Sequence, residues 1–136
     1  MDFLKSIAIA ASGLRAQAGR MRVISENIAN ADSTAQRGGG DPYRRKIPTF
    51  RHEIDRALQA SVVGMGRTQT DQSEFRSKYE PGHPAANAAG YVKYPNVNPL
   101  IEMTDMREAQ RSYEANLNVI GATRRMLQRT IDILRA

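Results

Sequence analysis

The side chains that most often carry out catalysis are few in this sequence, and their spacing does not suit it. The chain has no cysteine, which excludes disulfides, thiolate zinc ligands and cysteine nucleophiles together. Its two histidines, His52 and His83, lie far apart, and neither has another histidine at metal-ligand spacing. Gly38-Gly39-Gly40 is not followed by the lysine and hydroxyl residue of a phosphate-binding loop, and it is typical of a linker. We therefore expect no enzyme, no bound metal and no cofactor.

Cationic side chains indicate a second kind of chemistry, the binding of anions. The net charge is +6, and such a balance is common in nucleic-acid-binding proteins. The excess charge is spread along the chain, however, and the only dense patch is Arg44, Arg45 and Lys46, which acidic residues flank. Because phosphate binding needs several cations on one surface, we expect no nucleic-acid partner. The patch is either a solvated strand edge or a basic edge that faces an anionic partner.

Proline and glycine divide the chain into three segments. All six prolines and seven of the ten glycines lie between Gly38 and Pro99. The flanking segments have no interior proline and permit long helices. We therefore predict an N-terminal helical arm over 1–34, a small β/loop domain over 35–97 and a long helix over 98–136 that packs with the N-terminal arm.

Apolar residues recur at heptad spacing in both arms. In the N-terminal arm, the first set of positions holds Ile7, Leu14, Met21 and Ile28, and the alternate set holds Phe3, Ala10, Gln17, Ile24 and Ala31. In the C-terminal arm, the first set holds Met106, Tyr113, Ile120, Leu127 and Leu134, and the alternate set holds Met103, Gln110, Leu117, Arg124 and Ile131. Such a pattern is typical of coiled coils.

The C-terminal arm also carries the signals of a long helix. Asn98 suits the N-cap and Pro99 the first helical position. Acidic residues such as Glu102 lie early and arginines lie late, as the helix dipole favours. A helix of about 37 residues, roughly 55 Å long, is normally half of a coiled coil. Arg124 in its seam either extends to solvent or pairs with a carboxylate of a neighbouring helix.

The middle segment is predicted to form short strands and turns. Candidate strands lie within Tyr43–Phe50, Ser61–Thr70, Phe75–Tyr79 and Gly90–Tyr94. The stretch Arg51–Ala60 is open to a short helix instead. The predicted fold class is mainly α: long N- and C-terminal helices in a coiled-coil-like pair, with a small irregular β-rich middle domain. Because this middle is too small to cover the remaining faces of the arms, we expect other subunits to complete their burial.

Six stretches of the sequence resemble motifs of flagellar rod and hook proteins. They are Ala11–Gln17, Ile24–Thr34, Pro42–Lys46, Tyr79–Pro84, Gly90–Asn98 and Tyr113–Asn116. By these residues the chain is similar to the flagellar basal-body rod protein family, and within it to the proximal-rod members. Residues 35–40 and 51–74 match least.

The resemblance implies a structural subunit of the proximal rod, the drive shaft that transmits torque from the motor ring to the distal rod and hook. It implies a place in the periplasm after export by the flagellar type III apparatus, without a cleaved signal peptide. The implied partners are other copies of the chain, other proximal-rod proteins, the motor (MS) ring with its rod adaptor, the distal rod protein and the export apparatus. Another coiled-coil adaptor of a secretion apparatus, or a basic nucleic-acid-binding helical protein, is the alternative.

The apolar seams are the predicted assembly interface. The resemblance adds Asn27 and Asn30, which it assigns to the turn and interface at the end of the N-terminal helix; simple C-capping explains both asparagines as well. The predicted interface consists of Phe3, Ile7, Leu14, Met21, Ile24, Asn27, Ile28, Asn30, Met103, Met106, Tyr113, Leu117, Ile120, Arg124, Leu127, Ile131 and Leu134. If the seams are fully buried, Leu117→Ala or Ile28→Ala costs about 2–5 kcal/mol of stability.

Overall fold

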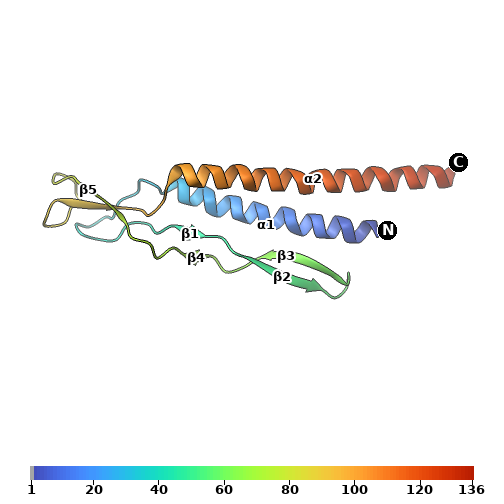
Figure 1. Ribbon diagram of the computed structural model, residues 1–136, viewed down its shortest axis with the longest axis horizontal. Helices are drawn as coiled ribbons and strands as arrows, with labels where there is room; N and C mark the ends of the chain where they lie inside the picture. Colours follow the sequence, from blue (N-terminus) through green and yellow to red (C-terminus); the bar gives the residue numbers. More distant parts are fainter. Residues whose placement is uncertain (1) are drawn as a thin grey trace. The chain divides into compact units, whose positions relative to one another are not determined.

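The computed structural model describes residues 2–136, and Figure 1 shows its long helices and short strands. Helix α1 spans Phe3–Ala29 and helix α2 spans Pro99–Arg135. The strands of the described residues are β1 (Lys46–Ile47), β2 (Phe50–Asp55), β3 (Ala60–Met65), β4 (Gln69–Thr70), β5 (Arg76–Tyr79) and β6 (Tyr91–Tyr94). They pair as three separate two-stranded antiparallel sheets, β1 with β4, β2 with β3 and β5 with β6.

The predicted mainly α class is wrong. The helices hold 47% of the residues and the strands 18%, so the chain mixes both kinds of structure. The long terminal helices are present, but the middle segment is more regular than predicted. Its β-branched and aromatic residues pair across antiparallel strands. The stretch that was open to a short helix, Arg51–Ala60, instead holds most of β2 and the turn that follows it.

The two helix starts are capped by side chains. The Asp2 carboxylate accepts a hydrogen bond from the Lys5 amide at 3.1 Å, at the start of α1. The Asn98 side chain accepts one from the Leu100 amide at 3.1 Å, with Pro99 as the first residue of α2. The predicted start of the C-terminal helix is thus confirmed.

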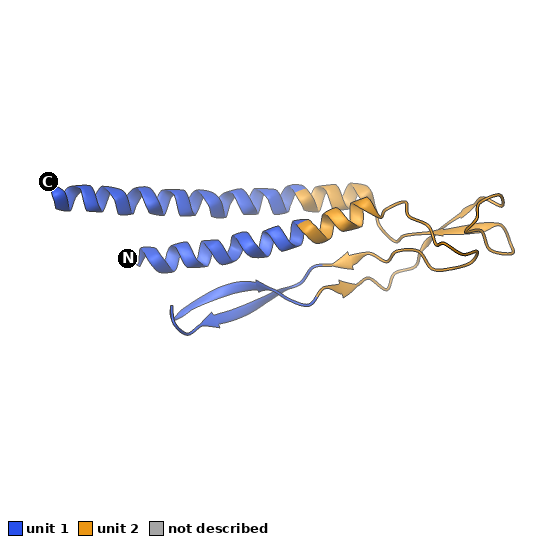
Figure 2. Ribbon diagram, turned by 180° about the vertical axis from the view of Figure 1, so that it is seen from behind, with its two compact units in different colours: residues 1–21, 48–67, 107–136 blue, residues 22–47, 68–106 orange. Residues whose placement is uncertain are grey.

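The chain forms two compact units, which Figure 2 colours separately. Unit 1 consists of Met1–Met21, Pro48–Arg67 and Arg107–Ala136, and unit 2 consists of Arg22–Ile47 and Thr68–Met106. Each unit therefore combines residues of both helices with residues of the middle segment. The predicted division into 1–34, 35–97 and 98–136 follows the sequence order instead, and it stays a prediction.

In unit 1, α1 contacts both α2 and the β2–β3 hairpin through small residues. A Cβ atom on Gly13 would lie 2.8 Å from Asn116 Nδ2 of α2, so glycine lets the two helices approach closely. On the hairpin side, the Ser12 hydroxyl accepts a hydrogen bond from the Val63 amide at 3.3 Å. Arg20 of α1 also pairs with Glu108 of α2 at 3.4 Å. The two contacts to α2 show that the helices run antiparallel.

The buried aliphatic residues of unit 2 come from α1, from β6 and from the connecting segments. They are Val23, Ile24, Ala31, Ala85, Val92 and Val97. Arg76 of β5 holds the end of the α1 segment, since its Nη2 donates to the Ala31 carbonyl at 2.9 Å. Gly90 has a φ of +84°, a conformation that side-chain-bearing residues rarely adopt. It precedes β6, whose Tyr91 lies edge to face with Tyr79 of β5, with ring centroids 5.3 Å apart.

Candidate assembly interface and its polar clamp

Asn27 lies near the end of α1 and is completely buried although its side chain is polar. Its Nδ2 donates to the Lys46 carbonyl at 2.8 Å and to Glu102 Oε2 at 3.1 Å. Its Oδ1 accepts from the Lys46 amide at 2.9 Å and from the Tyr43 hydroxyl at 2.8 Å. The amide thus makes all four of its hydrogen bonds, and two of them pair with β1 as a neighbouring strand would. Asn27 therefore joins three elements, and its interpretation as a simple C-cap is wrong.

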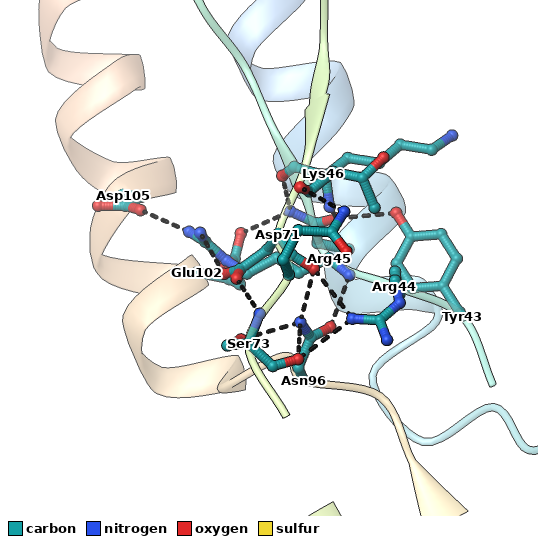
Figure 3. Close-up of polar contacts among 12 residues, drawn as sticks. Tyr43, Arg44, Arg45, Lys46, Asp71, Ser73, Asn96, Glu102 and Asp105 are labelled. Atoms are coloured by element: carbon teal, nitrogen blue, oxygen red, sulfur yellow. Dashed lines mark hydrogen bonds and ion pairs between the residues drawn. The ribbon is translucent and has the colours of Figure 1, made fainter. Parts of the chain in front are cut away.

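Arg45 carries the ion pairs of the same region. Its Nε contacts Glu102 Oε1, while its Nη1 lies 3.6 Å from Asp71 and its Nη2 lies 3.7 Å from Asp105. Figure 3 shows Glu102 and Asp105 of α2 with Arg45. Glu102 is only 1% exposed, and it shares its two oxygens between Arg45 and Asn27. A carboxylate buried this deeply is stable only with such partners.

The backbone of Arg45 is held by a second asparagine. The Arg45 amide donates to Asn96 Oδ1 at 2.8 Å, and the Arg45 carbonyl accepts from the Asp71 amide at 2.9 Å. Asn96 Nδ2 in turn donates to the Asp71 carbonyl at 3.1 Å and to Ser73 Oγ at 2.9 Å. The side-chain amides of Asn27 and Asn96 therefore make hydrogen bonds to the backbone of Arg45 and Lys46. In a wider sheet, the backbone of a neighbouring strand would make such bonds. We call Asn27, Arg45, Asn96 and Glu102 the polar clamp.

The other two cations of the predicted basic edge also have partners within the chain. The Arg44 guanidinium lies 4.2 Å from the centre of the Phe75 ring, and it donates to the Ser73 carbonyl at 3.2 Å. Lys46 forms an ion pair with Glu26 of α1. Arg44, Arg45 and Lys46 are therefore engaged inside unit 2, and a further contact of this edge with a partner stays a prediction.

The surroundings of Arg45 and Asp71 favour the charged form of each side chain. Hydrogen bonds from the Ser73 amide and hydroxyl, together with the Arg45 charge, lower the pKa of Asp71. Burial alone would lower the pKa of Arg45, but the hydrogen bond and charge of Glu102 raise it overall, with help from Asp71 and Asp105. Burial, together with nearby carboxylates, raises the pKa of Tyr43 to about 12. At neutral pH, Arg45 and Asp71 are thus ionised while Tyr43 keeps the proton that it donates to Asn27.

The predicted interface residues of α1 lie largely within the chain. Ile24 and Asn27 are buried, while Phe3, Ile7, Leu14, Met21, Ile28 and Asn30 are half-buried. Asn30 differs from Asn27, because its Nδ2 donates to the Glu26 carbonyl at 2.8 Å and so does cap the helix end.

The predicted interface residues of α2 divide into two groups. Those of the first heptad set are mostly half-buried, namely Met106, Tyr113, Ile120 and Leu127. Those of the alternate set are exposed, namely Met103, Leu117, Arg124 and Ile131. Leu134, the last residue of the first set, is exposed as well. Their part in assembly stays a prediction, but they do not form a buried seam within the single chain.

The positions that α2 buries within the chain lie one residue before those of the predicted alternate set. Glu102, Ala109 and Thr123 are buried, and Asn116 lies against Gly13. Within the single chain, the buried positions of α2 therefore lie one residue before the alternate set of the predicted seam, whose part in assembly stays a prediction. Apolar periodicity does not indicate these positions because they hold small and polar residues. The sequence indicates Glu102 only as a favourable charge early in the helix, but it is the residue of α2 that belongs to the polar clamp.

Sites of other kinds are not found among the described residues. Within residues 2–136, no three histidine, aspartate or glutamate side chains come together as a possible metal site. Neither of the two described helices has the length and apolar character that a membrane crossing needs.

Comparisons with known proteins identify the class of this chain. Residues 7–35 match a family described as "Flagella basal body rod protein", and residues 88–133 match "Flagellar basal body rod FlgEFG protein C-terminal". These matches cover much of the two arms, and both describe flagellar basal-body rod proteins.

Full-length relatives define the family more narrowly. The flagellar basal-body rod protein FlgC of Agrobacterium fabrum is 53% identical, with 100% of this chain and 99% of the relative aligned. The FlgC proteins of Bacillus subtilis and Salmonella typhimurium are each 38% identical over 98% of this chain and 99% and 98% of their own lengths. The chain therefore belongs to the FlgC family of flagellar basal-body rod proteins. It is a structural subunit of the basal-body rod, and the prediction from sequence resemblance is confirmed.

Proposed function

We propose that this subunit polymerises through its two terminal helices in the proximal rod, where it forms part of the shaft that transmits torque. The observation that carries the proposal is the exposed apolar surface of α2. Its large exposed apolar side chains are Leu100, Ile101, Met103, Leu117, Val119, Met126, Ile131, Ile133 and Leu134. Apolar surface of this extent is typical of an interaction site.

Six of these nine exposed side chains fall into two stripes. Met103, Leu117 and Ile131 recur at multiples of seven residues, while Val119, Met126 and Ile133 are seven residues apart in another position. At about 100° per residue, the two stripes lie on different sides of the helix. A subunit inside a helical assembly has neighbours on several sides, so two stripes suit an assembly better than a single dimer contact.

The partners follow from this place in the rod. We propose contacts with other copies of the chain, with other proximal-rod proteins, with the motor (MS) ring and its rod adaptor, and with the distal rod protein. We also propose that the chain reaches the periplasm through the flagellar type III export apparatus. The role is structural and not catalytic, in keeping with the absence of cysteine and of paired catalytic groups.

The test is a comparison of two truncations. Leu117 is 52% exposed, so Leu117→Ala should change monomer stability by no more than about 0.5 kcal/mol. This replaces the estimate that assumed full burial. If Leu117 packs against a neighbour, the same variant should assemble fewer rods and reduce motility. Ile24→Ala is the matched control, because Ile24 is buried within the chain and its loss should cost about 2–5 kcal/mol.

Rod number in isolated basal bodies, motility in soft agar and chemical unfolding of the purified chain give the three readouts. Normal rods and motility with Leu117→Ala, at normal protein levels, would contradict an assembly contact at this stripe. A large loss of monomer stability would instead place Leu117 inside the fold.

A further inference from the structure

Within unit 1, the end of α2 projects beyond the start of α1 (Figure 2). Leu127 is the last half-buried residue of α2, and it lies at a shallow hollow that the first residues of α1 also line. Residues 128–136, which we call the helix overhang, are all exposed. Three of them are nevertheless large and apolar, since Ile131, Ile133 and Leu134 are 37%, 76% and 81% exposed.

The helix overhang is strongly amphipathic around its axis. At about 100° per residue, its three large apolar side chains fall within an arc of about 160° that Ile133 and Ile131 delimit. Each border of this arc carries an arginine. Arg129 lies beside Ile133 on one border, and Arg135 lies beside Ile131 on the other. Long arginine side chains can cover apolar surface with their stems while their charged ends extend away from it.

The charge of this end of α2 suits an anionic surface. Residues 121–136 hold four arginines and one aspartate, a net charge of +3. Two overhangs of neighbouring copies would bring like charges together, whereas anionic lipids attract basic segments. A helix with an apolar face and a basic face is also typical of proteins that lie on a membrane surface. Charge and amphipathicity thus favour a bilayer over a second overhang.

We propose that the helix overhang binds the surface of an anionic lipid bilayer. The helix lies in the plane of the interface and does not cross it. Ile131, Ile133 and Leu134 enter the boundary between headgroups and acyl chains, while Arg129 and Arg135 contact lipid phosphates from the two borders of the apolar arc.

This inference goes beyond the proposed function and does not depend on it. Ile131 and Ile133 also belong to the two stripes that are proposed as assembly contacts, so lipid and a neighbouring subunit compete for them. Bilayer binding is therefore a property of the free chain and not of the assembled subunit. Vesicles test the first proposal and rods test the second, so the failure of one is distinguishable from the failure of the other.

Flotation of the purified full-length chain with lipid vesicles measures the contact. Vesicles of equal parts phosphatidylglycerol and phosphatidylcholine should bind the chain at least about tenfold more tightly than vesicles of phosphatidylcholine alone. Added salt should weaken the binding to the anionic vesicles. No binding to these vesicles, or equal binding to both kinds, overturns the proposal.

Matched apolar positions separate the overhang from the rest of the chain. Ile133→Ser should weaken vesicle binding at least about tenfold, whereas Ile54→Ser, at a β2 position that is 70% exposed, should weaken it less than about twofold. Leu134→Ser and Leu100→Ser form a second such pair on α2, since Leu100 is 73% exposed at the other end of the helix. All four positions are exposed, and circular dichroism checks that each variant is folded. Equal losses within either pair overturn the proposal.

Matched arginines separate the site from the net charge of the chain. Arg129→Gln with Arg135→Gln should weaken binding about 20-fold, at about fivefold for each arginine near an anionic surface. Arg56→Gln with Arg67→Gln removes the same charge at exposed positions of unit 1 outside the overhang, and it should weaken binding less than about threefold. Equal losses would show attraction by net charge alone and would overturn the site.

A polarity-sensitive fluorophore on a single cysteine reports which side of the helix meets the lipid, since the sequence has no cysteine of its own. With anionic vesicles, the emission should shift to shorter wavelength for a label at Thr130→Cys, inside the apolar arc, but not for one at Gln128→Cys, on the polar side. A shift at both positions or at neither overturns the proposed orientation. If the chain does not bind vesicles but forms dimers that Leu134→Ser abolishes, the overhang is an interface between copies and the proposal fails.

Discussion

Replacement of Asn27 by alanine tests the polar clamp most directly. The change removes the hydrogen bonds of three neutral groups and of one carboxylate oxygen, at a position that is 0% exposed. Neutral hydrogen bonds contribute about 1 kcal/mol each and one to a charged group about 1.5–3 kcal/mol, so the loss is about 4–6 kcal/mol. A small domain is stable by only about 5–15 kcal/mol. We therefore expect Asn27→Ala to unfold unit 2 or bring it close to unfolding.

Urea unfolding followed by circular dichroism measures the loss. Asn30→Ala is a matched control in the same stretch of chain, because Asn30 is half-buried and makes a single side-chain contact with the Glu26 carbonyl. It should cost about 1 kcal/mol. If Asn27→Ala costs no more than Asn30→Ala, the reasoning that the buried amide holds this unit together is refuted. Asn27→Asp should destabilise as much as alanine at neutral pH, because it cannot donate and adds a charge beside Glu102.

Three further predictions concern packing and pH. Gly13→Ala should gain about 1 kcal/mol of helix propensity but lose about 1–3 kcal/mol to overpacking against Asn116. Gly13→Ala should therefore lower the melting temperature of the parent chain but raise that of the Asn116→Ala variant. A change of melting temperature in the same direction in both backgrounds would show that the contact is unimportant. Because the pKa of Asp71 is lower folded than its usual 3.8, its stabilising effect is present above that value and is lost as pH falls below it. Acid unfolding of Asp71→Asn should accordingly be less steep, and an unchanged slope would count against the hydrogen bonds from Ser73 and the pairing with Arg45 that lower this pKa. Since Tyr43 loses its proton near pH 12 when folded and near pH 10 when unfolded, stability should fall across that interval. Tyr43→Phe should lessen this fall in urea unfolding, and a fall as large as that of the parent chain would contradict the role of Tyr43.

The elements that depend on neighbouring residues were predictable from the sequence. The start of α2 follows from Asn98 and Pro99, because the capping hydrogen bond joins Asn98 to Leu100, only two residues further along the chain. The candidate strands contain β1, β4, β5, β6 and most of β3, whereas most of β2 lies in the stretch Arg51–Ala60, for which a short helix was the alternative. The fraction of strand was underestimated because these runs are short, and a single strand of four residues has little signal of its own.

The polar clamp was not predictable, because its partners are distant in sequence. Asn27 is 19 residues from Lys46 and 75 residues from Glu102, and Arg45 is 57 residues from Glu102. Local patterns contain no information about such pairs. The burial of Glu102 was not predicted for the same reason, since a rule that places the largest apolar residues inside does not account for a buried ion pair.

The composition of the two units has a consequence for the order in which the chain becomes structured. Unit 1 needs residues up to Ala136, and unit 2 needs residues up to Met106. A chain that emerges from a ribosome or a narrow passage with its N-terminus first therefore has α1 available long before either unit is complete. Contacts between such distant residues form slowly, because loop closure precedes any gain from packing. Unit 2 can thus close only after Met106 is free, and unit 1 only after most of α2 has followed.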